Sequence, residues 1–92
     1  MQFLQPNDIL TRITRYNLIR NQRLVYIDVH EALHGQLAAR FVAVPNLINI
    51  IARQEYQGVG TTEAEALQDC LSKVQNASLE DLFPRQANPA DK

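Results

Sequence analysis

The sequence predicts an α+β domain with the order helix, strand, strand, strand, helix, in which both helices pack on one face of a three-stranded antiparallel sheet. Three observations predict this fold: an alternating apolar pattern at 23–33 and apolar stripes with helical spacing at 8–20 and 62–75. The 92 residues suffice for one domain of this kind and not for two. We expect the domain to span 1–84 and a disordered polar tail to occupy 85–92.

The first helix is predicted at 8–20. Asn7 or Asp8, which follow Pro6, can accept a hydrogen bond from a free amide of the first helical turn. Apolar residues then recur where a helix would place them on one face: Ile9, Leu10, Ile13 and Tyr16. Arg12 and Arg15 fall off this stripe, so we expect both to face water.

Three strands are predicted to follow. Within 23–33, Val25, Ile27 and Val29 alternate with polar residues, which is typical of a half-buried strand. A turn at 34–36 leads to a second strand at 37–44.

Pro45 and Asn46 are predicted to end the second strand. Residues 47–57 fit either a short helix or a strand. We favour a third strand paired with the second, because Pro45-Asn46 makes a good tight turn and residues 56–59 also suit a strand.

The last helix has the clearest sequence pattern. Gly58 and Gly60 indicate a close backbone approach or a positive φ angle. Thr61 or Thr62 is expected to cap the helix, and Glu65, three residues after Thr62, forms a capping box with it. Apolar residues with helical spacing are expected to face the sheet: Ala66, Leu67, Cys70, Leu71 and Val74. A further capped turn is predicted at 78–83.

Composition restricts the function. The formal net charge is −1, with five arginines against three carboxylates in 1–46 and four cations against seven carboxylates in 47–92. This balance does not favour strong general binding to nucleic acid. The single cysteine excludes an intrachain disulfide, and no apolar run approaches the roughly 20 residues of a membrane span. We therefore expect a cytoplasmic protein that does not enter a membrane.

No catalytic constellation is present in the sequence. His30 and His34 lie at a strand end and a turn, which is a poor metal site, and Cys70 lies on an apolar helical stripe where a thiol is a core residue. The Gly-Val-Gly at 58–60 lacks the Gly-Lys-Ser/Thr of a phosphate loop. We expect a binding module that is not an enzyme and needs no metal, cofactor or small-molecule substrate.

The stretch GVGTTEAEAL resembles the entry to the last helix of double-stranded-RNA-binding domains, which typically reads Gly-x-Gly-x-Ser-Lys-Lys-x-Ala-Lys. The matching positions are Gly58, Gly60, Thr62 and Ala66. Glu63, Ala64 and Leu67 stand where that family places its phosphate-binding lysines. The resemblance therefore implies the scaffold without the phosphate clamp, used to bind protein, and we expect no tight binding to double-stranded RNA.

The chain also resembles antitoxins of the HicB type. The segments FVAVPNL at 41–47 and GTTEAEAL at 60–67 are similar to two motifs of that family. This resemblance likewise implies a protein that binds a protein partner.

The predicted partner is another protein or a second copy of this chain. An edge strand at Arg53–Tyr56 is the predicted docking strand, with Tyr56 as its aromatic anchor. The alternative partner is RNA, bound by the basic first helix and the hairpin turn. The residues predicted for that alternative are Arg12, Arg15, Arg20, Arg23 and His34.

Overall fold

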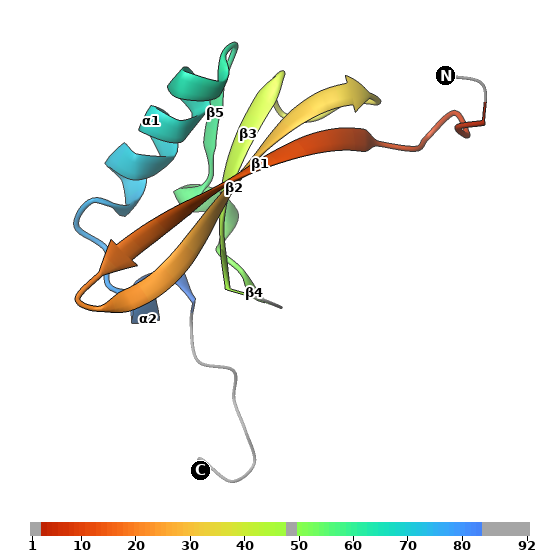
Figure 1. Ribbon diagram of the computed structural model, residues 1–92. Coiled ribbons are helices and arrows are strands. Elements are labelled where there is room, and N and C mark those ends of the chain that lie inside the picture. The colour runs from red at the N-terminus through yellow and green to blue at the C-terminus, as the bar shows by residue number, and fades with distance from the viewer. Residues whose placement is uncertain (1–2, 48–49, 84–92) are drawn as a thin grey trace, which may run out of the picture.

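The computed structural model describes residues 3–47 and 50–83, which form an antiparallel sheet with the longer helix packed against it (Figure 1). The elements in chain order are β1 (Leu10–Arg20), β2 (Arg23–His34), β3 (Phe41–Leu47), β4 (Ile50–Ile51), a 3₁₀ turn η1 (Gln54–Tyr56), β5 (Gly58–Gly60), α1 (Glu63–Val74) and α2 (Leu79–Leu82). None of the helices in this part of the chain combines the length and hydrophobicity needed to cross a membrane.

The predicted α+β class is confirmed, but the sheet is larger than the three strands predicted. Its order is β1-β2-β3, and two short segments share the outer side of β3. β5 pairs with Phe41–Ala43 and β4 pairs with Asn46 and Leu47. Within the described residues, five strand segments therefore fill four positions.

The helix predicted at 8–20 is wrong, because this segment forms β1. It pairs with β2 along its whole length, from Leu10 opposite His34 to Arg20 opposite Arg23. Asn21 and Gln22 have φ angles of 52° and 66°. Two consecutive positive φ angles make the type I′ turn whose twist matches that of a hairpin. The cross-strand pairing therefore overrides the helical spacing of the apolar residues.

The strand predicted at 23–33 is confirmed as β2, with one more residue at its end. Val25, Ile27 and Val29 are almost completely buried and face α1. Side chains from every layer complete this core: Ala43, Ala52, Ala66, Cys70, Val74, Leu82 and Phe83.

The second strand was predicted too early, at 37–44, because Pro45 does not end β3. Pro45 lies opposite Ile27, and its carbonyl accepts a hydrogen bond of 2.9 Å from the amide of Ala52. The register of β2 and β3 points the main-chain groups of Pro45 outward, to the gap between β4 and β5. A proline is tolerated there because no ladder hydrogen bond requires its missing N–H.

The third strand predicted at 47–57 is only partly correct. Ile50–Ile51 pairs with β3 as expected, but Gln54–Tyr56 forms the 3₁₀ turn η1. The rest of the pairing with β3 is made by β5, which comes after that turn. Residues 48–49 lie outside the described residues.

The last helix is confirmed as α1. The Thr62 side chain accepts a hydrogen bond from the Glu65 amide at 3.1 Å, and the Glu65 carboxylate accepts one from the Thr61 amide at 2.9 Å. Leu71 was predicted to face the sheet, but it is exposed. The capped turn predicted at 78–83 is confirmed as α2, where Ser78 and Asp81 form a capping box.

Candidate protein-interaction surface

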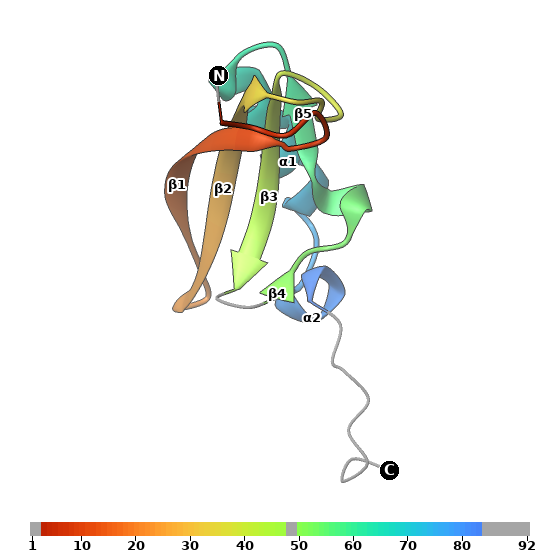
Figure 2. The same cartoon turned by 90° about the vertical axis from the view of Figure 1, so that its right-hand side faces the viewer.

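The sheet has a second face that no helix covers within the described residues. Figure 2 views this face, with β1, β2 and β3 side by side and α1 behind them. We call it the open face. The strand registers place five exposed apolar residues on it: Ile13 (50% exposed), Ile19 (70%), Leu24 (45%), Ile51 (64%) and Val59 (41%).

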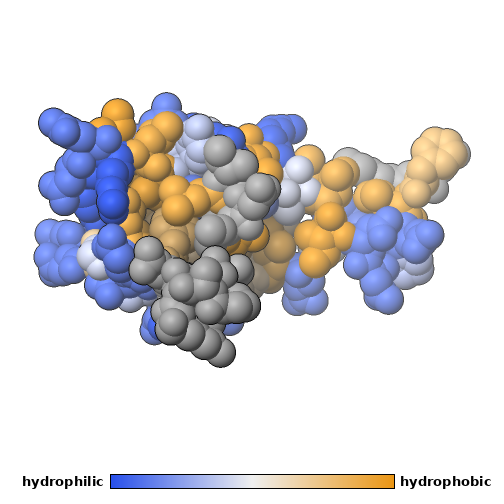
Figure 3. Space-filling model, turned by 90° about the horizontal axis from the view of Figure 1, so that it is seen from below, coloured by the Kyte–Doolittle hydropathy of each residue, from blue (hydrophilic) through white to orange (hydrophobic). Residues whose placement is uncertain are grey.

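The exposed apolar side chains of the open face lie around a polar centre. In the space-filling view from below, hydrophobic residues reach the surface across the middle of the molecule (Figure 3). Exposed apolar patches rimmed by polar residues are typical of interaction sites in water-soluble domains. The open face is therefore a candidate site for a partner that has apolar side chains of its own.

The centre of the open face is a polar network around Asp28. Arg15 of β1 donates two hydrogen bonds to the Asp28 carboxylate, from Nε at 2.7 Å and from Nη2 at 3.1 Å. Asn46 of β3 donates a third at 3.0 Å. The Arg15 guanidinium also lies over the Tyr26 ring, 4.2 Å from its centroid. The network ties β1, β2 and β3 together and holds Arg15 flat against the sheet.

This network predicts an acid-dependent contribution of Asp28 to stability. The hydrogen bonds from Arg15, with a smaller contribution from Asn46, hold the pKa of the Asp28 carboxyl below its usual range, although burial opposes the shift. A lowered pKa in the folded state means that the stabilisation is complete above the unfolded-state pKa of about 4. It is lost as the pH falls through the folded-state value.

We expect Asp28→Asn to lower the free energy of unfolding by about 1–2 kcal/mol at pH 7, because it removes the charge that Arg15 and Asn46 bind. Urea unfolding at several pH values between about 7 and 2 measures the effect, and the difference from the wild type should shrink below about pH 4. Glu80→Gln is the control, because the Arg23–Glu80 pair is exposed at 3.3 Å and should not matter measurably. A difference that does not change with pH would contradict the role of the Asp28 charge.

The outer edge of β1 is the second feature of this surface. Among the described residues, β1 pairs only with β2. A two-residue hairpin loop makes its closing pair, here Arg20 and Arg23, a hydrogen-bonded pair. Even-numbered residues of β1 therefore direct their main-chain groups to β2, and odd-numbered residues direct theirs outward. We call this outward row, which comprises residues Ile13, Arg15, Asn17 and Ile19, the free edge.

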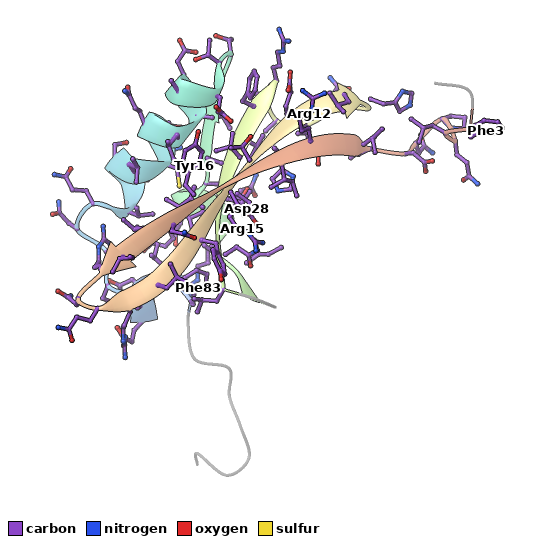
Figure 4. All side chains as sticks on the ribbon, in the orientation of Figure 1. Phe3, Arg12, Arg15, Tyr16, Asp28 and Phe83 are labelled. Carbon is purple, nitrogen blue, oxygen red and sulfur yellow. The ribbon has the colours of Figure 1, made fainter. Side chains whose placement is uncertain are left out.

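The four arginines predicted to form one basic surface do not lie together. Because β1 is a strand, Arg12 and Arg20 lie on the side of the sheet that faces α1, and Arg15 lies on the open face. Figure 4 shows Tyr16 towards α1 and Arg15 with Asp28 on the other side. Arg23 lies at the end of the hairpin, where it pairs with Glu80.

Each described arginine and lysine also has an acceptor within reach. Arg20 donates to the carbonyls of Val74 and Ala77 at 2.8 and 2.9 Å, where it closes the C-terminal end of α1. The remaining pairs are Arg12 and Arg40 with Glu31, Arg15 with Asp28, Arg23 with Glu80, Arg53 with Glu55 and Lys73 with Asp69. Because these cations are distributed over both faces and each has an acceptor nearby, the described residues form no concentrated basic patch.

The other predicted site residues lie elsewhere. His34 is the last residue of β2, opposite Leu10, and Gly35 after it has the positive φ angle of a turn. The edge strand predicted at Arg53–Tyr56 is wrong, because Gln54–Tyr56 forms the 3₁₀ turn η1. Tyr56 is partly buried against the core and its carbonyl accepts from the Cys70 thiol at 3.4 Å, so Tyr56 is not an exposed anchor.

The described residues contain no group of three or more histidine, cysteine or acidic side chains placed to hold a metal ion. Cys70 is fully buried, and this desolvation raises the pKa of its thiol to about 11. His30 lies on the open face, where its Nδ1 is 3.1 Å from the Thr11 hydroxyl.

The exposed isoleucines of β1 on the open face, Ile13 and Ile19, were not among the predicted site residues. Both were assigned to a helix, in which Ile13 would have faced the core. The two consecutive polar residues Asn21-Gln22 between Arg20 and Arg23 were the local signal for a hairpin.

Comparison of the chain with protein-family models, with curated proteins and with solved structures finds no match.

Proposed function

We propose that this chain is a non-catalytic module that binds protein through the open face and the free edge of its sheet. The observation that supports this proposal is the combination of exposed isoleucines and outward main-chain groups on the same strand. Ile13 and Ile19 project from β1 onto the open face, and their own amides and carbonyls belong to the free edge. A partner strand added to β1 gains main-chain hydrogen bonds and apolar contacts together.

RNA binding is the alternative raised by the arginines of the sequence, and no contact favours it. Arg12 and Arg15 lie on opposite faces of the sheet, and both have carboxylate partners. The resemblances to double-stranded-RNA-binding domains and to HicB-type antitoxins stay predictions. Both already implied a protein partner.

Photo-crosslinking in cells tests the proposal. A benzophenone amino acid in place of Ile19 should give protein adducts of discrete mass, because this side chain is exposed beside the free edge. The matched control is the same amino acid in place of Gln68, which is exposed on α1 away from the open face. Equal adducts from both positions, or none from Ile19, would contradict the proposal. Adducts that disappear on ribonuclease treatment would favour RNA instead.

A further inference from the structure

Within the described residues, the free edge of β1 lacks the protection that natural edge strands usually carry. β1 is 11 residues long and contains no proline, and its only irregularity lies at its start, between Leu10 and Thr11. Protected edges are short, bulged or guarded by charged side chains. A long regular edge of this kind readily accepts another strand.

The arginines of β1 do not guard this edge. Arg15 is held across the sheet by Asp28 on β2, and Arg20 is held by the carbonyls at the end of α1. Arg12 lies 3.8 Å from Glu31, also on β2. All three guanidinium groups are therefore directed back over their own sheet and away from an approaching strand.

α1 does not block the approach either. It packs against β5, β3 and β2. In Figures 1 and 2 it lies towards the β5 side of the sheet, away from the outer edge of β1.

A second copy of the chain fits this edge in a defined register. Two copies of β1 related by a two-fold axis pair antiparallel, with outward odd-numbered residues opposite outward odd-numbered residues. The axis must therefore pass beside one residue of β1. If that residue is Tyr16, Ile13 lies opposite Ile19 of the second copy and Arg15 lies opposite Asn17. The two most exposed apolar residues of β1 then cover each other.

Neighbouring registers are less favourable. A two-fold axis at Arg15 places Ile13 opposite Asn17, and an axis at Asn17 places Ile19 opposite Arg15, so neither register brings the two isoleucines together. An axis at Thr14 places Ile13 opposite Arg15. In the register centred on Tyr16, Arg12 lies opposite Arg20 of the second copy, and these two groups already bind Glu31 and the α1 carbonyls.

We propose that the partner of the free edge is a second copy of this chain, and that the two β1 strands pair antiparallel about a two-fold axis at Tyr16. This inference rests on the proposed function, of which it specifies the partner. The pairing makes one continuous sheet with roughly eight new main-chain hydrogen bonds. Both α1 helices lie on one face of that sheet, and the two open faces join on the other.

Sedimentation of the whole chain at about 100 μM tests the dimer, because contacts of micromolar affinity are populated there. We expect a dimer for the wild type and for Asn17→Thr, which keeps the outward amide. Asn17→Pro removes that amide without breaking the pairing with β2, and should weaken dimerisation at least about 100-fold. Circular dichroism checks that both variants fold. A wild-type monomer, or a folded Asn17→Pro variant that dimerises normally, overturns the inference.

Disulfide formation tests the register independently. Thr14 lies opposite Leu18 of the second copy as a non-hydrogen-bonded pair, with Cα atoms about 4.5 Å apart, which suits a disulfide. A mixture of Thr14→Cys and Leu18→Cys chains should crosslink on oxidation, and neither variant should do so alone. Absence of crosslinking in the mixture overturns the register. A monomer that still gives protein adducts from position 19 overturns only the dimer and leaves the proposed function standing.

Discussion

We expect Gly58→Ala to lower the free energy of unfolding by at least about 3 kcal/mol, a large part of the stability of a domain this size. The reason is the close approach of β5 to α1. A Cβ atom at Gly58 would overlap the Ala66 carbonyl and the Cys70 amide, and would lie 2.8 Å from the Cys70 Cα. These are backbone atoms of a helix, so they cannot move aside as the end of a flexible side chain can.

Denaturant unfolding followed by circular dichroism measures this effect. Val59→Ala is the matched control, because Val59 is the next residue of β5 and its side chain is exposed on the open face. We expect the control to stay within about 0.5 kcal/mol of the wild type. If both variants were equally stable, the packing of β5 against α1 would be incorrect.

The second large effect distinguishes a buried isoleucine from an exposed one. Ile27→Ala should cost about 2–5 kcal/mol of stability, because Ile27 is 1% exposed and its loss leaves a cavity between the sheet and α1. Ile19→Ala should change stability by less than about 0.5 kcal/mol, because Ile19 is 70% exposed. The same Ile19 change should weaken partner binding by about tenfold, since it removes apolar area from the proposed contact.

Unfolding in urea and a binding or sedimentation assay on both variants give the two readouts. If Ile19→Ala were as destabilising as Ile27→Ala, Ile19 would belong to the core. If Ile19→Ala left every association unchanged, β1 would not be part of the binding surface.

The elements whose pattern is local were predicted correctly from the sequence. The prediction was wrong where the structure of a segment depends on pairing with residues far away in the chain. α1 was predicted correctly because its cap, Thr62 with Glu65, and its apolar spacing are all read within a few residues. β2 was predicted because its core-facing residues Val25, Ile27 and Val29 are apolar and alternate with other residue types.

β1 was missed because both of its faces carry apolar residues. Tyr16 and Leu18 pack against the core, whereas Ile13 and Ile19 lie on the open face. The alternation of a half-buried strand is therefore absent, and the same residues match a helical stripe by chance. Only the pairing with β2 resolves this ambiguity, and that pairing cannot be seen in a local window.

The candidate site was missed for the same reason. A helix would have placed Arg12 and Arg15 together in solvent. The strand instead places them on opposite faces, each near a carboxylate.

Pro45 caused a different error in the prediction. It usually ends a strand, but here it lies where β3 has a gap in its outer pairing.

Amide hydrogen exchange along β1, resolved residue by residue by NMR, tests the free edge most directly. In dilute protein, the amides of Thr14, Tyr16 and Leu18 should exchange slowly because they bond to β2, and those of the free edge, Ile13, Arg15, Asn17 and Ile19, should exchange fast. At about 500 μM, where a second copy binds with micromolar affinity, the free-edge amides should become slow as well. Free-edge amides that are slow even at the lowest concentration, or that stay fast in a protein shown to be associated, would contradict binding through β1.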